Sequence, residues 1–198
     1  MIKIILFDAD GMIIKRDAYF SERFCNDFSV DPEKISFFFR REWYDIVTGK
    51  ADLKDILKKY LTEWHWSGSV EDLLDYWFVS ERHVDESIRD HIVQLKSSGI
   101  ICCLATNQEK YRFNYITNTM EFGLLFDRLY ASCNLGVKKP DPTYFDYIWK
   151  DLGKPDKKSI LFWDDTKANV YSSREFGIQA EIYTTFDAYL DKMQQYGL

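Results

Sequence analysis

Residues 2–11 read IKIILFDADG, and this stretch decides the fold class. An almost continuous apolar run of this length predicts a strand that is buried on both faces, as in a parallel sheet. The run stops at Asp8, and Asp10 and Gly11 follow. Because Asp and Gly are common turn formers, this acidic pair alone fits a strand-ending turn as well as a functional site.

Similar apolar runs recur along the rest of the chain, at residues 100–105, 128–131, 159–163 and 180–183. Helical patterns lie between them, at residues 85–98, 143–152 and 169–176. Residues 143–152 follow Asp141-Pro142 and precede Gly153, an arrangement that is typical of helix ends. Strands and helices in alternation predict an α/β fold with right-handed crossovers.

Residues 17–84 interrupt this alternation, because they contain no convincing strand. Helical stretches are expected at residues 18–28, 32–47, 51–64 and 70–79. An insertion directly after the first strand is well placed to cover that strand's end. We therefore expect a core of residues 1–16 and 85–198 and an inserted, all-helical cap of residues 17–84, although an extra helical layer is the plainer alternative.

Other polar residues follow the later strands. Thr106 and Glu109 have the spacing of a capping box, which predicts a helix start and, with it, an anion site. Lys139 precedes Pro140 and should be extended, although a solvated lysine would look the same. Asp164 and Asp165 are adjacent acids that would repel each other unless a cation such as Mg²⁺ binds there.

The positions of these residues carry more weight than their types. All of them fall just beyond the carboxyl end of a predicted strand. In open α/β sheets, ligands bind at that edge. We therefore expect an acidic pair, a hydroxyl, a lysine and a second acidic pair to converge there.

In this order, these elements resemble the haloacid dehalogenase superfamily of hydrolases. Asp8-Ala9-Asp10-Gly11 resembles its first motif, Thr106 the second, Lys139 the third, and Asp164-Asp165 with Asn169 the fourth. The resemblance covers essentially the whole chain and implies a Rossmann-like parallel sheet with the helical cap of subfamily I. Met12 departs from the family, which often has Thr there, and Lys138 is a competing candidate for the third motif.

The resemblance also implies roles for these residues. Asp8 would be the nucleophile, and Asp10 would protonate the leaving oxygen and then activate water. Mg²⁺ would be bound by Asp8, the Asp10 carbonyl and Asp165, with Asp164 as a further ligand or an outer-shell partner. Thr106, the Asn107 backbone and Lys139 would hold the phosphoryl group, and Asn169 would support the acidic loop.

Elementary electrostatics agrees with these roles. A carboxylate attacking a phosphate meets a repulsion of about 4 kcal/mol per charge pair at about 4 Å, so the site needs cations. Expelling an alkoxide needs a proton donor whereas expelling a halide does not, so Asp10 favours phosphate-ester chemistry over carbon–halogen cleavage.

The composition narrows the partners. A formal net charge of −6 argues against non-specific nucleic-acid binding. No segment is apolar for long enough to span a membrane. The four cysteines form no CxxC pair, which fits a reduced, cytoplasmic setting.

The expected function is thus a Mg²⁺-dependent phosphatase acting on a small phosphorylated metabolite, a sugar phosphate or nucleoside monophosphate, through an aspartyl-phosphate. A phosphomutase and a non-catalytic binding module are the alternatives. The three histidines are interpreted as surface or packing residues. The aromatic clusters of residues 17–84 are interpreted as cap core or as contacts with the main domain, although they could also stack on a substrate ring.

Overall fold

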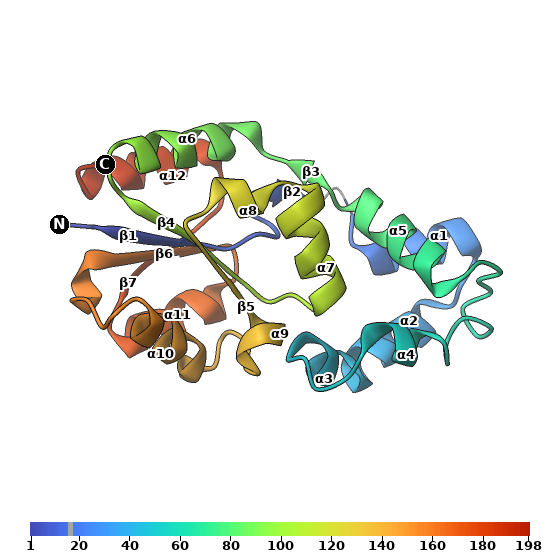
Figure 1. Cartoon of the computed structure of the whole chain (residues 1–198). Helices are drawn as coiled ribbons and strands as arrows, with labels where there is room; N and C mark the ends of the chain where they lie inside the picture. Colours follow the sequence, from blue (N-terminus) through green and yellow to red (C-terminus); the bar gives the residue numbers. More distant parts are fainter. Residues whose placement is uncertain (16–17) are drawn as a thin grey trace.

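A computed structural model describes residues 1–15 and 18–198. The expected boundary between core and cap, at residues 16 and 17, lies outside the described residues. The core is a five-stranded parallel sheet with the order β5-β4-β1-β6-β7 (Figure 1). Its strands are β1 (Ile4–Phe7), β4 (Ile101–Thr106), β5 (Arg128–Ala131), β6 (Ile160–Asp164) and β7 (Gln179–Ile182). All five predicted strands are therefore confirmed, with ends that differ by at most two residues.

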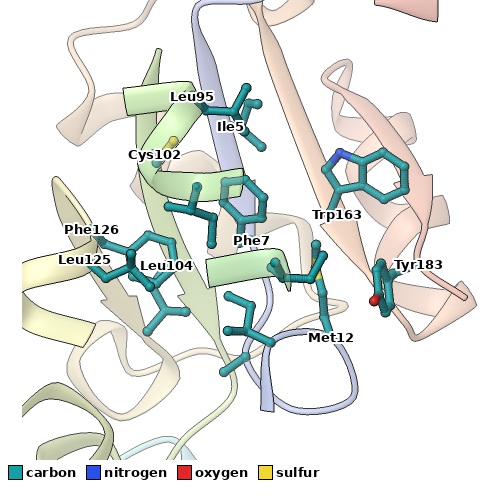
Figure 2. Close-up of a cluster of buried hydrophobic side chains, with 14 of the residues drawn as sticks. Ile5, Phe7, Met12, Leu95, Cys102, Leu104, Leu125, Phe126, Trp163 and Tyr183 are labelled. Atoms are coloured by element: carbon teal, nitrogen blue, oxygen red, sulfur yellow. The ribbon is translucent and has the colours of Figure 1, made fainter. Parts of the chain in front are cut away.

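Alternate residues of β1 face opposite layers of helices. Ile5 and Phe7 pack in a cluster with side chains of α6 (Glu86–Ser97) and α12 (Phe186–Gln195). Figure 2 shows part of this cluster, including Leu95 of α6. Ile4 and Leu6 pack on the other side, with α10 (Pro142–Asp151) and α11 (Lys167–Phe176). Both faces of the central strand are thus buried, which explains its unbroken apolar sequence.

The remaining core elements are short. They are α7 (Lys110–Asn114), a π-helical turn (Tyr115–Thr119), α8 (Phe122–Leu125), α9 (Ser132–Leu135) and a 3₁₀ turn (Lys157–Ser159). The predicted helix at 143–152 is confirmed as α10, with Asp141 accepting a hydrogen bond from the Thr143 N–H at 2.8 Å.

The insertion forms a helical lobe beyond the carboxyl edge of the sheet (Figure 1). Its helices are α1 (Phe20–Phe28), α2 (Pro32–Arg41), α3 (Trp43–Val47), α4 (Leu53–Leu57) and α5 (Val70–Ser80). They enclose a separate apolar cluster that includes Phe24, Phe38 and Trp64. Phe38 and Trp64, from two of the aromatic clusters in the sequence, thus lie in the core of the lobe.

Three expectations for the insertion were wrong. The helix expected at 32–47 is divided at Glu42, where the bend lets Phe39 and Trp43 both pack on Trp77. The helix expected at 51–64 ends at Leu57, and turns then bring Trp64 into the lobe's core.

The third wrong expectation was the absence of any strand. β3 (His83–Val84) pairs antiparallel with β2 (Ile14–Lys15), so a two-stranded ribbon joins the lobe to the core. A strand of two residues is too short to leave a period in the sequence. None of the helices in the described part of the chain is both long and apolar enough to cross a membrane.

Candidate active site

Three carboxylates meet at the carboxyl ends of β1 and β6. Asp8, Asp164 and Asp165 each offer an oxygen, and these oxygens lie within 4.8 Å of one another. The Asp164 side chain is fully buried and that of Asp8 is 11% exposed. This concentration of negative charge in a poorly hydrated place fits a hard divalent cation, which prefers oxygen ligands.

Lys139 is buried inside this acidic cluster rather than solvated. Its Nζ atom lies 2.9 Å from Asp8 Oδ1, 2.6 Å from Asp164 Oδ2 and 2.7 Å from the Ala105 carbonyl oxygen. An ammonium group has three protons, so each acceptor can receive one. Lys139 is thereby held beside the first acid of the chain, and Lys138 has no comparable contact among the described residues.

Burial and charge act against each other in this pair. Burial raises the pKa of Asp8 well above its ordinary value, and Asp164 adds to the rise while Lys139 opposes it. Burial lowers the pKa of Lys139, but attraction by Asp164 and Asp8 outweighs burial and leaves that pKa raised. The lysine is therefore charged at neutral pH. Further positive charge near Asp8 would favour the ionised form of the Asp8 carboxyl group.

The loop after β6 is held through Asp164. Asn169 Nδ2 donates to both carboxylate oxygens of Asp164, at 3.0 and 2.9 Å, and the Thr166 N–H donates to Oδ1 at 2.8 Å. Asp165, the next residue, is half-buried. Asp164 is thus fixed by protein donors, and Asp165 completes the acidic cluster beside it.

The helix expected to begin at Thr106 begins later. Thr106 is the last residue of β4, where it pairs with Ala131 of β5. The N-cap of α7 is Glu109, whose carboxylate accepts the N–H groups of Tyr111 and Arg112. Sheet pairing thus extends the strand through the position at which the capping-box spacing predicted a helix.

Asn107 connects two of the predicted site segments. Its side-chain Nδ2 donates to the Lys139 carbonyl at 3.0 Å, and its Oδ1 accepts the Lys139 N–H at 2.9 Å. The amide therefore clamps the backbone of Lys139 from both sides. Only the backbone of Asn107 was given a role from the sequence, so this contact is new.

The side chain of Asp10 lies apart from the acidic cluster. Gln108 Nε2 donates to Asp10 Oδ2 at 2.6 Å, and Arg112 Nη2 lies 3.8 Å from Oδ1. Neither Gln108 nor Arg112 was identified from the sequence. Gln108 lies two residues beyond Thr106, in the stretch that the sequence reading assigned to a helix.

A cavity of about 310 Å³ lies between the core and the helical lobe. Asp10, Asn107 and Gln108 line it from the core, and Phe20, Trp43 and Trp77 line it from the lobe. Glu81 also lines it and accepts hydrogen bonds from the Phe20 N–H and from Trp77 Nε1, at 2.9 and 3.1 Å. Burial raises the pKa of Glu81, and the nearby charge of Asp10 adds to that rise.

The chain is similar to parts of longer, curated proteins. It is 31% identical over 78 residues to drimenol cyclase drtB from Aspergillus calidoustus, and 25% identical over 104 residues to bifunctional epoxide hydrolase 2 from Mus musculus. These matches cover 39% and 50% of this chain but only 15% and 19% of those proteins. The chain therefore spans a small part of the relatives that it matches.

A solved structure matches over nearly the full length. The HAD family enzyme bt-2542 from Bacteroides thetaiotaomicron superposes with a TM-score of 0.82 at 18% identity, over 96% of this chain and 98% of that one. That enzyme has also been solved in complex with magnesium and inorganic phosphate. At this identity, the likeness establishes the fold.

Residues 2–177, which include β1, the inserted lobe and every member of the acidic cluster, match the haloacid dehalogenase-like hydrolases. The match spans well over half of the sequence, in a chain whose sheet and helical insertion agree with a solved enzyme of that family. The chain belongs to the haloacid dehalogenase-like hydrolase family.

Proposed function

We propose that the protein is a Mg²⁺-dependent phosphatase that hydrolyses a small phosphate monoester through a phosphorylated Asp8. One observation supports this proposal above all others. Three carboxylates and a buried lysine gather at the end of β1, beside a cavity that contains a further acid, Asp10. The magnesium and phosphate complex of bt-2542, a protein of the same fold, supports it independently.

In the first step, an oxygen of Asp8 attacks the phosphorus atom, and the bond from phosphorus to the leaving oxygen breaks. Lys139 keeps the attacking carboxylate in place, and its ammonium charge would also attract the phosphoryl group. Thr106 and the Asn107 backbone would bind the remaining phosphoryl oxygens. Asp10 would give its proton to the leaving oxygen, so that an alcohol departs rather than an alkoxide.

In the second step, water attacks the phosphorus atom of the aspartyl-phosphate. Asp10, now ionised, would take a proton from this water, and the bond between Asp8 and phosphorus breaks. Free phosphate leaves and both acids return to their starting states. Dividing one displacement into two in this way lowers the barrier of each.

Asp8, Asp165 and the Asp10 carbonyl would hold Mg²⁺, with Asp164 as a further ligand or an outer-shell partner. When bound, the ion offsets the repulsion between the Asp8 carboxylate and the incoming phosphate. The fit of the site to this ion rests on the oxygen-only donor set and on its excess negative charge.

The charges that line the cavity favour a substrate that carries a single phosphate and is otherwise uncharged. Arg112 is the only cationic side chain among the described residues that line it, and Asp10, Glu81 and Glu109 line it as well. A second phosphate would meet these acids. The aromatic walls suit the apolar face of a ring, so a sugar phosphate or a nucleoside monophosphate remains the proposed substrate class.

The test is phosphate release by the purified protein from p-nitrophenyl phosphate and from a panel of metabolite monophosphates. We expect turnover with Mg²⁺, and none after chelation or in Asp8→Asn. Circular dichroism should give the same spectrum for the variant and the wild type, because the substitution preserves shape.

Each failure has a distinct meaning. Turnover by folded Asp8→Asn would rule out the proposed nucleophile. Absence of turnover across the panel would favour a binding module, and turnover that requires a bisphosphate primer would favour a phosphomutase.

A further inference from the structure

The acid that lies apart from the acidic cluster has its own set of polar partners. Gln108 is 4% exposed, and its Nε2 donates to Asp10 Oδ2 at 2.6 Å and lies 3.4 Å from Thr106 Oγ1. Asp10 Oδ1 is buried and has no hydrogen-bond partner among the described residues. The two oxygens of this carboxyl group are therefore in different surroundings.

The contact with Gln108 fixes how the Asp10 carboxyl group is turned. A side-chain amide nitrogen only donates, so Asp10 Oδ2 must act as an acceptor toward Gln108. Gln108 therefore holds Oδ2 at a fixed place and restricts rotation of the Asp10 carboxyl group. This hydrogen bond orients the carboxyl group relative to the cavity that Asp10 lines.

Arg112 lies on the Oδ1 side of the same carboxyl group. Its side chain is 4% exposed, and Nη2 is 3.8 Å from Asp10 Oδ1. A positive charge at this distance stabilises the carboxylate that remains once the proton has left. Arg112 Nε is buried and has no hydrogen-bond partner among the described residues, so the guanidinium is not saturated by its surroundings.

The other donors of Arg112 reach the helical lobe. Nη1 donates to the Phe78 carbonyl at 3.1 Å, and Nη2 donates to the Glu81 carbonyl. These carbonyls lie at the C-terminal end of α5, where a helix dipole favours a cation. Arg112 therefore connects the end of a lobe helix to Asp10 across the cavity.

We propose that Gln108 and Arg112 are positioning residues that orient Asp10 for proton transfer. Through its bonds to the lobe, Arg112 makes this orientation depend on the position of the lobe relative to the core. This inference rests on the proposed function. The proton moves from the Asp10 carboxyl group to the leaving oxygen as the bond from phosphorus to that oxygen breaks. It is replaced from the attacking water when the aspartyl-phosphate is hydrolysed, so the acid is regenerated.

The test compares two leaving groups in Gln108→Leu and Arg112→Met. p-Nitrophenolate departs without a proton, whereas the alkoxide of glycerol 2-phosphate needs one. We expect kcat to fall by about 10- to 100-fold with the alkyl ester and by less than about threefold with the aryl ester. KM for the aryl ester should stay close to that of the wild type.

Two controls make the comparison specific. Gln94→Leu makes the same replacement at an exposed position of α6 and should change neither rate. Asp10→Asn removes the acid itself, so it gives the largest loss of alkyl-ester turnover relative to aryl-ester turnover, and the positioning variants should not exceed this loss. Turnover of the aryl ester shows that a variant has folded with its nucleophile in place.

The outcomes separate the two claims. Equal losses with both esters in both variants, or unchanged alkyl-ester turnover, would overturn the positioning role and leave the phosphatase proposal intact. A wild-type protein that released phosphate from neither ester, nor from the metabolite panel, would overturn the proposed function, and this inference with it.

Discussion

Lys139 compensates the negative charge of the acidic cluster, and its burial explains why an uncharged residue could not replace it. Its ammonium group lies between Asp8 and Asp164, at 2.9 and 2.6 Å, and is 1% exposed. Removing one partner of a buried ion pair leaves an uncompensated charge, which costs about 3 to 5 kcal/mol.

We therefore expect Lys139→Met to lower the free energy of unfolding, measured in the presence of a chelator, by about 3 kcal/mol. With Mg²⁺ present, the variant should release no phosphate. Urea denaturation followed by circular dichroism measures the first effect. Lys138→Met is the matched control and should change stability little, because the neighbouring lysine has no such contact among the described residues. Similar losses in both variants would contradict the assignment of Lys139 to the third motif.

Glu109 makes the stability depend on pH. Burial raises its pKa from 4.5 to about 7, although the N–H groups of Tyr111 and Arg112 oppose the rise. Because the folded pKa is the higher one, the folded state keeps a proton that the unfolded state loses between these values. The free energy of unfolding therefore falls as the pH rises through this window, by at most about 3 kcal/mol.

Glu109→Gln should remove this dependence, so its stability curve should be flatter between about pH 4.5 and 7. Urea denaturation at several pH values measures the curve. Glu175→Gln, at an exposed position of α11, should leave the slope unchanged. A slope in Glu109→Gln equal to that of the wild type would contradict the origin assigned to it.

At the scale of single elements, Gly49 lets the lobe approach the core. Its φ is +74°, and a Cβ added there would overlap the backbone carbonyl of Cys133 in α9. Close by, Ser132 Oγ donates to the Val47 carbonyl at 2.7 Å. This segment between α3 and α4 therefore seats the lobe on α9.

Gly49→Ala should cost more stability than Gly153→Ala, since Gly153 has a similar φ of +82° but nothing within 4 Å of an added Cβ. We expect about 1 kcal/mol for Gly153→Ala and a larger loss for Gly49→Ala, together with a higher KM because the lobe shifts. Thermal denaturation and steady-state kinetics measure both. Equal losses and an unchanged KM would mean that the contact does not seat the lobe.

The elements also show where sequence reasoning succeeds and where it stops. Long apolar runs and the cap signals of residues 141–153 are local, and they predicted β1 and α10 well. The prediction of a helix start at Thr106 was wrong because Thr106 pairs with Ala131, which is distant in sequence, and this pairing extends β4. The two-residue ribbon of β2 and β3 leaves no local signal at all.

For the molecule as a whole, the parallel sheet explains why the candidate site was largely predictable. Residues at or beyond the carboxyl ends of strands converge at one edge of a parallel sheet, and for that reason the sequence predicts that Asp8, Lys139 and Asp164 lie together. Strand order could not be read in the same way, because it depends on crossovers rather than on local pattern.

The contacts of Arg112 were equally out of reach. They join a core helix to carbonyls of an inserted lobe, and backbone carbonyls carry no residue identity. The limit of sequence reasoning in this protein is therefore the interface between core and lobe, where the cavity beside Asp10 lies.

The most direct measurement is a crystal structure of the protein with Mg²⁺ and beryllium trifluoride, a mimic of a phosphoryl group. We predict beryllium bonded to an oxygen of Asp8, with the metal ion beside Asp8 and Asp165. The fluorine atoms should lie near Thr106 and Lys139. Beryllium bound elsewhere, or an Asp8 that contacts neither the metal ion nor the mimic, would contradict the proposed phosphatase.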